Sequence, residues 1–329
     1  MMQRDFGIFI EDVDPVDLRV EEGKVPTLDG RLKGDYVFGE YTFDESTFVV
    51  KTPSGRVQLE EGLIRARSVA PHELFRWVTA EMRRHLMEKE VLVLHAAAVA
   101  RDGLAHIFPA WAQTGKTNLL LNLVSHGYGY MADDWCPVSV SGEVLAYPRG
   151  LALFEYNFDC YPELVEALGD GKEGRVFRRQ LAGTKFARSL DGSNRLSRSL
   201  KRWMLKRFFV YGYMPVSELI PGSRITRRAS LAEVCLLTTK SGESLISQVS
   251  PRYLARKVAL ANQVEWFPFT RYKVAREYAG LQRMSEHLVS KEEEILTRIF
   301  SKAKCTALTL SPYATGEEMD RIRRMWEEA

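Results

Sequence analysis

The sequence predicts an α/β fold in which a phosphate-loop (P-loop) core follows a small β-rich N-terminal domain. Three observations lead to this prediction. A strand at Ala105–Phe108 leads into a loop that ends in Gly-Lys-Thr, and an apolar helical run follows from Lys116 to about His126. After Gly127, a second strand ends at two consecutive aspartates. The N-terminal part of the chain, up to Ala70, contains short β-prone runs separated by Gly, Pro and Asp turns.

The N-terminal region is predicted to be a separate domain, residues 1–70, that acts as a lid or holds a substrate. No catalytic pattern is visible in it. Its β-prone runs predict four strands, at Phe6–Ile10, Tyr36–Phe38, Thr47–Lys51 and Arg56–Leu59. The P-loop domain is predicted to cover residues 71–329, with a basic insertion at about 170–228.

The rest of the chain alternates helical and strand patterns. Apolar residues recur every four positions between Pro71 and Glu88, which predicts an amphipathic helix. The other predicted elements are one continuous or interrupted strand over 91–94 and 96–100, a turn at Asp102-Gly103, a hairpin over 138–147, a short helix over 161–168 ending at Gly169, a strand at 234–239, a helix from Ser250-Pro251 to about 263, a long helical region over roughly 273–302, a strand at 306–310 and a terminal helix with a capping box of Thr315 and Glu318.

The loop at 110–117 reads Ala-Trp-Ala-Gln-Thr-Gly-Lys-Thr, close to the pattern G-x-x-x-x-G-K-[ST]. In that pattern, backbone N–H groups and the helix N-terminus bind phosphate oxygens, the lysine neutralises them, and the hydroxyl holds Mg²⁺. ATP or another phosphoryl donor is therefore the expected ligand. The predicted nucleotide-binding residues are Ala112, Gln113, Thr114, Gly115, Lys116, Thr117 and Asn118. Ala110 replaces the first glycine, and its Cβ is expected to alter the loop or weaken binding. An ordinary strand–turn–helix is the alternative.

Asp133 and Asp134 lie at the tip of the second strand, the first strand after the helix that Lys116 begins. Adjacent residues on a strand point to opposite faces, so both acids can serve one site only at a strand end. Their mutual repulsion can raise the pKa of one carboxyl into a useful range. Asp133 is predicted to be the general base for an acceptor hydroxyl. Asp134 would orient it or reach Mg²⁺ through water. A turn with two solvated acids is the alternative.

These residues resemble the HPr kinase/phosphorylase family. The similar stretch runs from Leu94 to about Arg149 and contains Leu-His-Ala-Ala-Ala-Val, the P-loop and Met-Ala-Asp-Asp. The interval from His95 to Lys116 and the interval from Lys116 to Asp133 are both similar to those of the family. The resemblance implies a serine-directed kinase core, a mixed sheet with flanking helices related in fold to phosphoenolpyruvate carboxykinase. It implies a phosphotransferase acting on a hydroxyl of a peptide, protein or small molecule, and it suggests a homo-oligomer.

The resemblance also assigns roles to individual residues. His95 would be a catalytic partner of Asp133 or of the transferred phosphate, with a core histidine as the alternative. The Glu-x-Arg-Gly signature of the family is not intact, and Pro148-Arg149-Gly150 with Glu155 nearby comes closest. Glu155 is therefore predicted as a metal ligand together with Thr117 and Asp134. Because of this departure, and because Gln113 also stands where the family usually has glycine, HPr itself is not the expected acceptor.

Charge is concentrated in one segment of a chain whose net charge is only +3. Residues 172–228 contain fifteen Lys and Arg against three acids. One interpretation is a set of solvated loops and helices, and a second is a docking surface for an acidic or phosphorylated partner. A third is that Lys201–Phe209 lies on an anionic membrane or on nucleic acid. Nothing else resembles a nucleic-acid-binding module, which argues against nucleic acid.

Cysteine usage and hydropathy predict a cytoplasmic protein. The four cysteines form no C-x-x-C pair, so buried thiols in a reducing compartment are expected. No apolar run approaches the roughly 18–20 residues of a membrane span, and the N-terminus lacks a signal-peptide pattern. Two other functions stay open beside the kinase. One is a catalytically inactive nucleotide-binding module, and the other is a docking or assembly protein that acts through residues 172–228.

Overall fold

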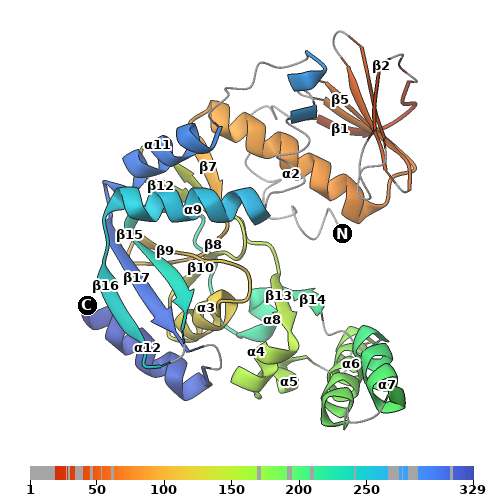
Figure 1. The fold of residues 1–329 in the computed structure, drawn as a ribbon. Coiled ribbons are helices and arrows are strands. Elements are labelled where there is room, and N and C mark those ends of the chain that lie inside the picture. Colours follow the sequence, from red (N-terminus) through yellow and green to blue (C-terminus); the bar gives the residue numbers. More distant parts are fainter. Residues whose placement is uncertain are drawn as a thin grey trace. The chain divides into compact units, whose positions relative to one another are not determined.

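The computed structural model describes residues 19–329 except 27, 29, 34–39, 45–46, 53, 61–62, 169–171, 191–194, 208–210, 241, 266–273, 276, 281–287 and 312–313. The described residues form a mixed α/β structure (Figure 1). By contacts the chain divides into two compact units. Unit 1 comprises residues 1–94, 138–141 and 251–301, and unit 2 comprises 95–137, 142–250 and 302–329. This division does not follow the boundary expected after residue 70, because three helices join the N-terminal sheet in unit 1.

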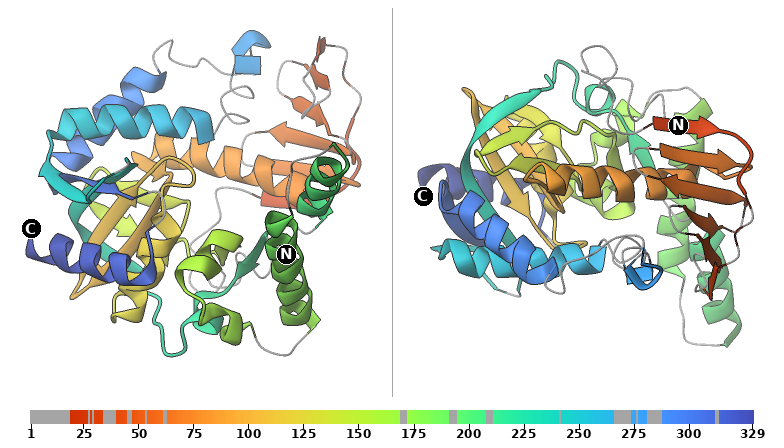
Figure 2. Two further views of the ribbon diagram at one scale, coloured as in Figure 1. Left: turned by 60° about the horizontal axis from the view of Figure 1, so that its bottom comes forward. Right: turned by 90° about the horizontal axis from the view of Figure 1, so that it is seen from above.

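Unit 1 contains a six-stranded sheet with the order β1-β6-β5-β4-β3-β2, whose strands lie side by side (Figure 2). Its strands are β1 (Arg19–Glu22), β2 (Gly30–Lys33), β3 (Glu40–Phe43), β4 (Phe48–Lys51), β5 (Arg56–Glu60) and β6 (Leu63–Arg67). Within this sheet β1 and β6 are parallel, and the other described pairs are antiparallel. The strands predicted over 47–51 and 56–59 are confirmed. Those predicted at 6–10 and 36–38 lie outside the described residues.

Three helices of unit 1 meet at one buried carboxylate. They are α2 (Pro71–Glu88), α9 (Pro251–Glu265) and α11 (Leu288–Phe300). Glu292 of α11 accepts hydrogen bonds from Arg83 of α2 at 2.9 Å, Asn262 of α9 at 2.6 Å and Gln263 of α9 at 3.0 Å. Because Glu292 and Arg83 are both buried, loss of either partner would leave an uncompensated buried charge. The predicted helices at 71–88 and from 251 are confirmed.

The long helical region predicted over roughly 273–302 is confirmed in part, because a turn interrupts it. Residues 279–280 form a turn, and Gly280 has a φ of +75°. That left-handed conformation is accessible to glycine at little cost and ends a helix. Residues 274–275 and 277–278 before the turn are helical, and helix α11 begins at Leu288.

Unit 2 is built on a mixed sheet in which β10, β8, β9 and β15 are neighbours, with β17 and β12 also paired to β15 and β16 paired to β17. These strands are β8 (Ala96–Arg101), β9 (Leu104–Pro109), β10 (Gly129–Ala132), β12 (Glu143–Leu145), β15 (Arg228–Thr239), β16 (Leu245–Gln248) and β17 (Lys304–Leu310). The turn at Asp102-Gly103 joins β8 to β9 with positive φ at both residues. The strands predicted at 96–100, 105–108, 128–132, 234–239 and 306–310 are confirmed, although β15 begins earlier, at Arg228.

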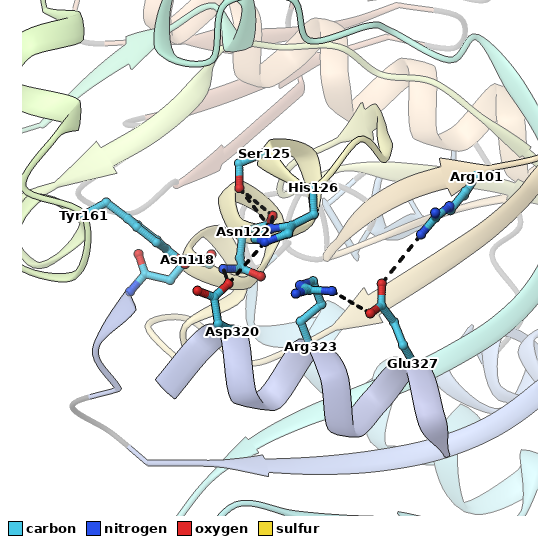
Figure 3. Close-up of polar contacts among 9 residues, drawn as sticks. All are labelled: Arg101, Asn118, Asn122, Ser125, His126, Tyr161, Asp320, Arg323 and Glu327. Carbon is cyan, nitrogen blue, oxygen red and sulfur yellow. Dashed lines mark hydrogen bonds and ion pairs between the residues drawn. The ribbon is translucent and has the colours of Figure 1, made fainter. Parts of the chain in front are cut away.

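Helices α3 (Lys116–Ser125) and α12 (Gly316–Glu328) pack against each other and share one hydrophobic core with the sheet. Polar contacts reinforce this packing (Figure 3). Asp320 of α12 accepts a hydrogen bond from Asn122 of α3 at 2.8 Å. Glu327 lies 3.7 Å from Arg101 and 2.6 Å from Arg323. The predicted cap of the terminal helix is confirmed in part, since the Thr315 hydroxyl accepts a hydrogen bond from the Glu318 N–H at 3.3 Å.

The basic stretch contains two long helices that lie side by side, α6 (Lys172–Ser189) and α7 (Arg195–Arg207). The remaining elements are β7 (Val91–Leu94), β11 (Cys136–Ser139), α4 (Glu155–Cys160), α5 (Leu164–Ala167), α8 (Val216–Leu219) and an antiparallel pair of β13 (Leu151–Phe154) with β14 (Tyr211–Met214). The helix predicted over 161–168 is thus the shorter α5, and its predicted end at Gly169 lies outside the described residues. All four cysteines are buried and free, as predicted. Among the described residues no helix combines the length and apolarity needed to cross a membrane.

Trp326 is predicted to be the main anchor of α12. Its buried indole packs edge-to-face on His106 and Phe108, with ring centroids 4.9 and 5.2 Å away. Trp326→Ala removes a large buried side chain and should lower the free energy of unfolding by about 3–5 kcal/mol. Urea unfolding measures this. Trp203→Ala, at an exposed position of α7, is the matched control and should stay within about 0.5 kcal/mol of the parent. Equal losses in both variants would refute the anchor.

Candidate functional site

Strand directions in unit 2 bring three separate segments to one edge of the sheet. β8 is antiparallel to β9, and β10 is antiparallel to β8, so β10 and β9 run in the same direction. The start of β8 therefore lies at the same edge as the ends of β9 and β10. His95 immediately precedes β8, the loop 110–115 follows β9, and Asp133-Asp134 follow β10. The carboxyl ends of parallel strands are where α/β proteins usually bind ligands.

The loop after β9 has the left-handed residues that a tight turn into a helix requires. Gly115 has a φ of +89° and directly precedes α3. Gln113 has a φ of +62°, a conformation that costs a residue with a Cβ about 1–2 kcal/mol. Ala110 is not among the residues of positive φ, and it forms a parallel bridge with Leu237. The replacement of glycine is therefore costly to the backbone at Gln113 and not at Ala110.

Lys116 is the centre of the site. Its side chain is buried, and Nζ donates to Oδ1 of Asp134 at 2.6 Å. Nζ also lies 3.0 Å from Nε2 of His95. A lysine at the first position of α3 is thus joined to a residue 21 positions earlier and to one 18 positions later. These contacts place the sequence-predicted His95, Lys116 and Asp134 in one cluster.

The hydrogen bonds of His95 define its tautomer. Nδ1 lies 2.9 Å from the carbonyl oxygen of Ala110. Because a carbonyl only accepts hydrogen bonds, Nδ1 carries a proton, and in the neutral ring Nε2 is left as an acceptor for Lys116. Nε2 is also 3.4 Å from Oδ1 of Asp134. The imidazole therefore positions Lys116 beside Asp134, and its contact with the Ala110 carbonyl holds the start of the loop that follows β9.

Asp133 and Asp134 have opposite environments. Burial, followed by the charge of Asp134, raises the pKa of Asp133 to about 7. Thr117 donates to its Oδ2 at 3.2 Å, while Oδ1 is buried without a hydrogen-bond partner. Burial alone would raise the pKa of Asp134, but Lys116 and His95 together hold it well below the usual value. The pair thus combines one firmly ionised acid with one that titrates near neutrality, a division of labour typical of acid–base sites.

Helix α4 and Tyr161, the residue that follows it, add two contacts that the sequence did not reveal. Asn157 donates to the Asn118 side chain at 2.7 Å, and the hydroxyl of Tyr161 donates to the Asn118 carbonyl at 3.0 Å. The amide of Asn118, predicted to bind nucleotide, therefore faces α4. Tyr156 of the same helix is electrostatically coupled to the two acids, because burial, and then the charges of Asp133 and Asp134, raise its pKa to about 12. No motif in the sequence indicates Tyr156.

Glu155, predicted as a metal ligand, contacts a different set of residues. Its Oε2 pairs with Arg188 of α6 at 2.9 Å, and burial raises its pKa. No contact joins it to Asp134 or Thr117 among the described interactions. The part of the chain that the structure describes contains no group of three or more His, Cys, Asp or Glu side chains able to hold a metal. Mg²⁺ commonly binds through one or two protein groups with phosphates and water, and the Thr117 hydroxyl with the half-buried Asp134 carboxylate fits that mode.

Comparison with known proteins assigns no family. No protein-family model matches the chain, and no curated protein matches it. The resemblance to the HPr kinase/phosphorylase family therefore stays a prediction from the motif residues. The contacts of His95, Lys116, Thr117, Asp133 and Asp134 are independent of that resemblance.

Two substitutions in the loop should have opposite effects on stability. Gly115→Ala places a Cβ at a φ of +89° and should lower the free energy of unfolding by about 1–2 kcal/mol. Gln113→Gly relieves the same kind of strain, partly offset by chain entropy, and should leave stability unchanged or raise it by up to about 1 kcal/mol. Urea unfolding of both variants provides the measurement. A loss of similar size in both would contradict the assigned backbone conformations.

Asp133 should make folding stability depend on pH. Its pKa is raised from 3.8 to about 7, so the folded state binds more protons than the unfolded state between these values. The contribution of Asp133 to stability therefore falls as pH rises through this window. Asp133→Asn removes that titration, so its stability relative to the parent should rise from about pH 4 to about pH 7. Urea unfolding across the window tests this, and parallel pH profiles would refute the raised pKa.

Proposed function

We propose that the chain is a nucleotide- and Mg²⁺-dependent phosphotransferase that phosphorylates a hydroxyl. The single observation that carries the proposal is the cluster around Lys116. Nζ of this P-loop lysine lies 2.6 Å from Asp134, and the neighbouring Thr117 hydroxyl lies 3.2 Å from Asp133. A phosphate-binding cation and a carboxylate able to accept a proton near neutral pH are the parts that hydroxyl phosphorylation requires.

In this mechanism Asp133 is the general base. Its Oδ1 has no hydrogen-bond partner, so it is available to accept the proton of the acceptor hydroxyl. The freed oxygen attacks the terminal phosphorus of the nucleotide, and the bond from that phosphorus to the bridging oxygen breaks. The nucleoside diphosphate leaves. A pKa near 7 allows Asp133 to be ionised before the step and protonated after it.

Lys116 and the loop N–H groups stabilise the charge on the transferring phosphoryl group. In the structure Lys116 pairs with Asp134, and on nucleotide binding it contacts the phosphates instead. Thr117 and the released Asp134 would then hold Mg²⁺. The metal, when bound, supplies positive charge to the phosphate oxygens. His95 positions Lys116 through Nε2.

The acceptor class follows from the resemblance stated for the motif residues. A P-loop kinase core similar to that of the HPr kinase/phosphorylase family would act in the cytoplasm on a serine of a peptide or protein, or on the hydroxyl of a small molecule. The departures at Ala110, Gln113 and the Arg149-Gly150 signature favour an acceptor other than HPr.

A catalytically inactive nucleotide-binding module is the second candidate, favoured by the strained conformation of Gln113. Strain in a phosphate loop lowers affinity and misplaces backbone donors without removing the site. Calorimetry with Mg-ATP separates the two candidates. Nucleotide binding together with phosphoryl transfer supports the kinase, and binding without transfer to any acceptor supports the inactive module.

The kinase proposal predicts different effects of two variants. Asp133→Asn should lower phosphoryl transfer to a hydroxyl acceptor by roughly 10²–10⁴-fold and leave Mg-ATP binding within a few-fold of the parent. Lys116→Met should remove most nucleotide binding. Transfer of labelled phosphate from ATP to a library of serine peptides and polyols, combined with calorimetry, measures both. Asp102→Asn, in an exposed turn, is the matched control and should behave as the parent. No product above the Asp133→Asn background would refute the kinase.

A further inference from the structure

The helices α6 and α7 carry a concentration of positive charge that the proposed catalytic site does not use. Their sequences contain twelve Lys and Arg against one acid. Helix α7 alone has six cations and no acid in its 13 residues. Like charges on two adjacent helices repel one another, so this concentration of charge does not stabilise a surface that only water contacts. An anionic partner would neutralise it.

Exposed apolar side chains lie among these cations. Leu200 and Trp203 of α7 are 48% and 60% exposed, and they are three residues apart, so they share one face of the helix. Val176 and Phe186 of α6 are also at least half exposed. A basic helix with exposed aromatic and aliphatic residues is typical of helices that lie in the interface of a membrane. Tryptophan in particular favours the headgroup region.

The two helices contact each other, and α6 contacts α4 of the same unit. Lys201 of α7 donates to the carbonyls of Arg188 and Leu190 at the end of α6, at 3.1 and 3.3 Å. Phe177 of α6 packs on Phe158 of α4 with ring centroids 5.5 Å apart. These contacts bury one side of α6 and leave Leu200 and Trp203 of α7 exposed. Figure 1 shows the two helices as an antiparallel pair beside α4.

Ion pairs connect this helix pair to the helix that packs against the candidate site. Arg188 pairs with Glu155 at 2.9 Å and Lys185 pairs with Asp159 at 3.3 Å, both on α4. Glu155 thus acts as an anchor for α6. Asn157 of α4 also donates a hydrogen bond to Asn118 of α3. Helix α4 therefore contacts both the basic helix pair and the helix that follows the loop.

We infer that α6 and α7 form a peripheral docking surface for an anionic phospholipid bilayer, with Trp203 and Leu200 inserted among the headgroups and the surrounding Lys and Arg paired with lipid phosphates. A bilayer is favoured over an acidic peptide because the apolar residues project from a convex helix. Peptides usually bind in grooves that bury them on several sides, whereas a flat interface accepts a protruding indole. The inference is independent of the proposed kinase activity.

The test is co-sedimentation of the full chain with vesicles. Binding to mixed phosphatidylcholine–phosphatidylserine vesicles should exceed binding to pure phosphatidylcholine and should weaken as salt rises. Trp203→Ala with Leu200→Ala should reduce the partition coefficient about tenfold or more. Leu245→Ala is the matched control, since Leu245 is 65% exposed on β16, and it should bind as the parent.

Charge is tested separately from insertion. Arg175→Gln with Arg179→Gln removes two exposed cations of α6 and should lower vesicle binding roughly fivefold for each. Arg252→Gln, at an exposed position of α9, is the control. Circular dichroism and thermal unfolding verify that each variant is folded.

Three results would overturn the inference. One is equal binding to vesicles with and without phosphatidylserine, and another is unchanged binding by the Trp203–Leu200 variant. The third is tighter binding of a poly-glutamate peptide than of the anionic vesicles at the same salt, lost in the same variant. That third result would assign the surface to an acidic protein partner.

Discussion

The contact between Lys116 and Asp134 is the interaction on which the candidate site depends. In a poorly solvated place, one lysine faces two carboxylates and a histidine whose Nδ1 proton is already donated to a carbonyl. Lys116 bonds the half-buried Asp134, while Asp133 is fully buried, so Asp133 is the acid that takes up a proton more readily. Burial first, and then the charge of Asp134, raises the pKa of Asp133, whereas Lys116 and His95 outweigh burial and lower the pKa of Asp134.

This cluster in turn requires the strand directions of unit 2. If β10 ran against β9, Asp133 would lie at the other end of the sheet from the loop. Helix α12 supports the arrangement, because its Asp320 accepts a hydrogen bond from Asn122 of α3 and its Trp326 packs on Phe108 of β9. The contacts of α3 therefore contribute both to the stability of the fold and to the geometry of the candidate site. A change in this helix would affect both.

Local patterns could predict the centre of the site, because its residues follow short segments with clear strand, turn and helix signals. The Lys116 helix, the Gly127 helix end and the acids after β10 are of this kind. The role of Glu155 could not be read in that way, because its nearest charged partner, Arg188, is distant along the chain, in a helix that composition alone left unassigned. Tyr156 could not be recognised either, because no motif marks it. The turn at Gly280 could not be predicted, because the residues around it have a helical pattern.

The charge balance also explains why the proposed chemistry would need a divalent cation. In the structure Asp134 is the counter-ion of Lys116. The phosphate oxygens of a bound nucleotide would take its place. When a nucleotide displaces it, more negative charge enters the cluster, and the lowering effect of Lys116 on the pKa of Asp133 is shared with the phosphates. Asp133 would then hold its proton more tightly and be a poorer base. Mg²⁺ held by Thr117 would restore positive charge here, and it would favour the ionised form of Asp133 as well as neutralise the nucleotide.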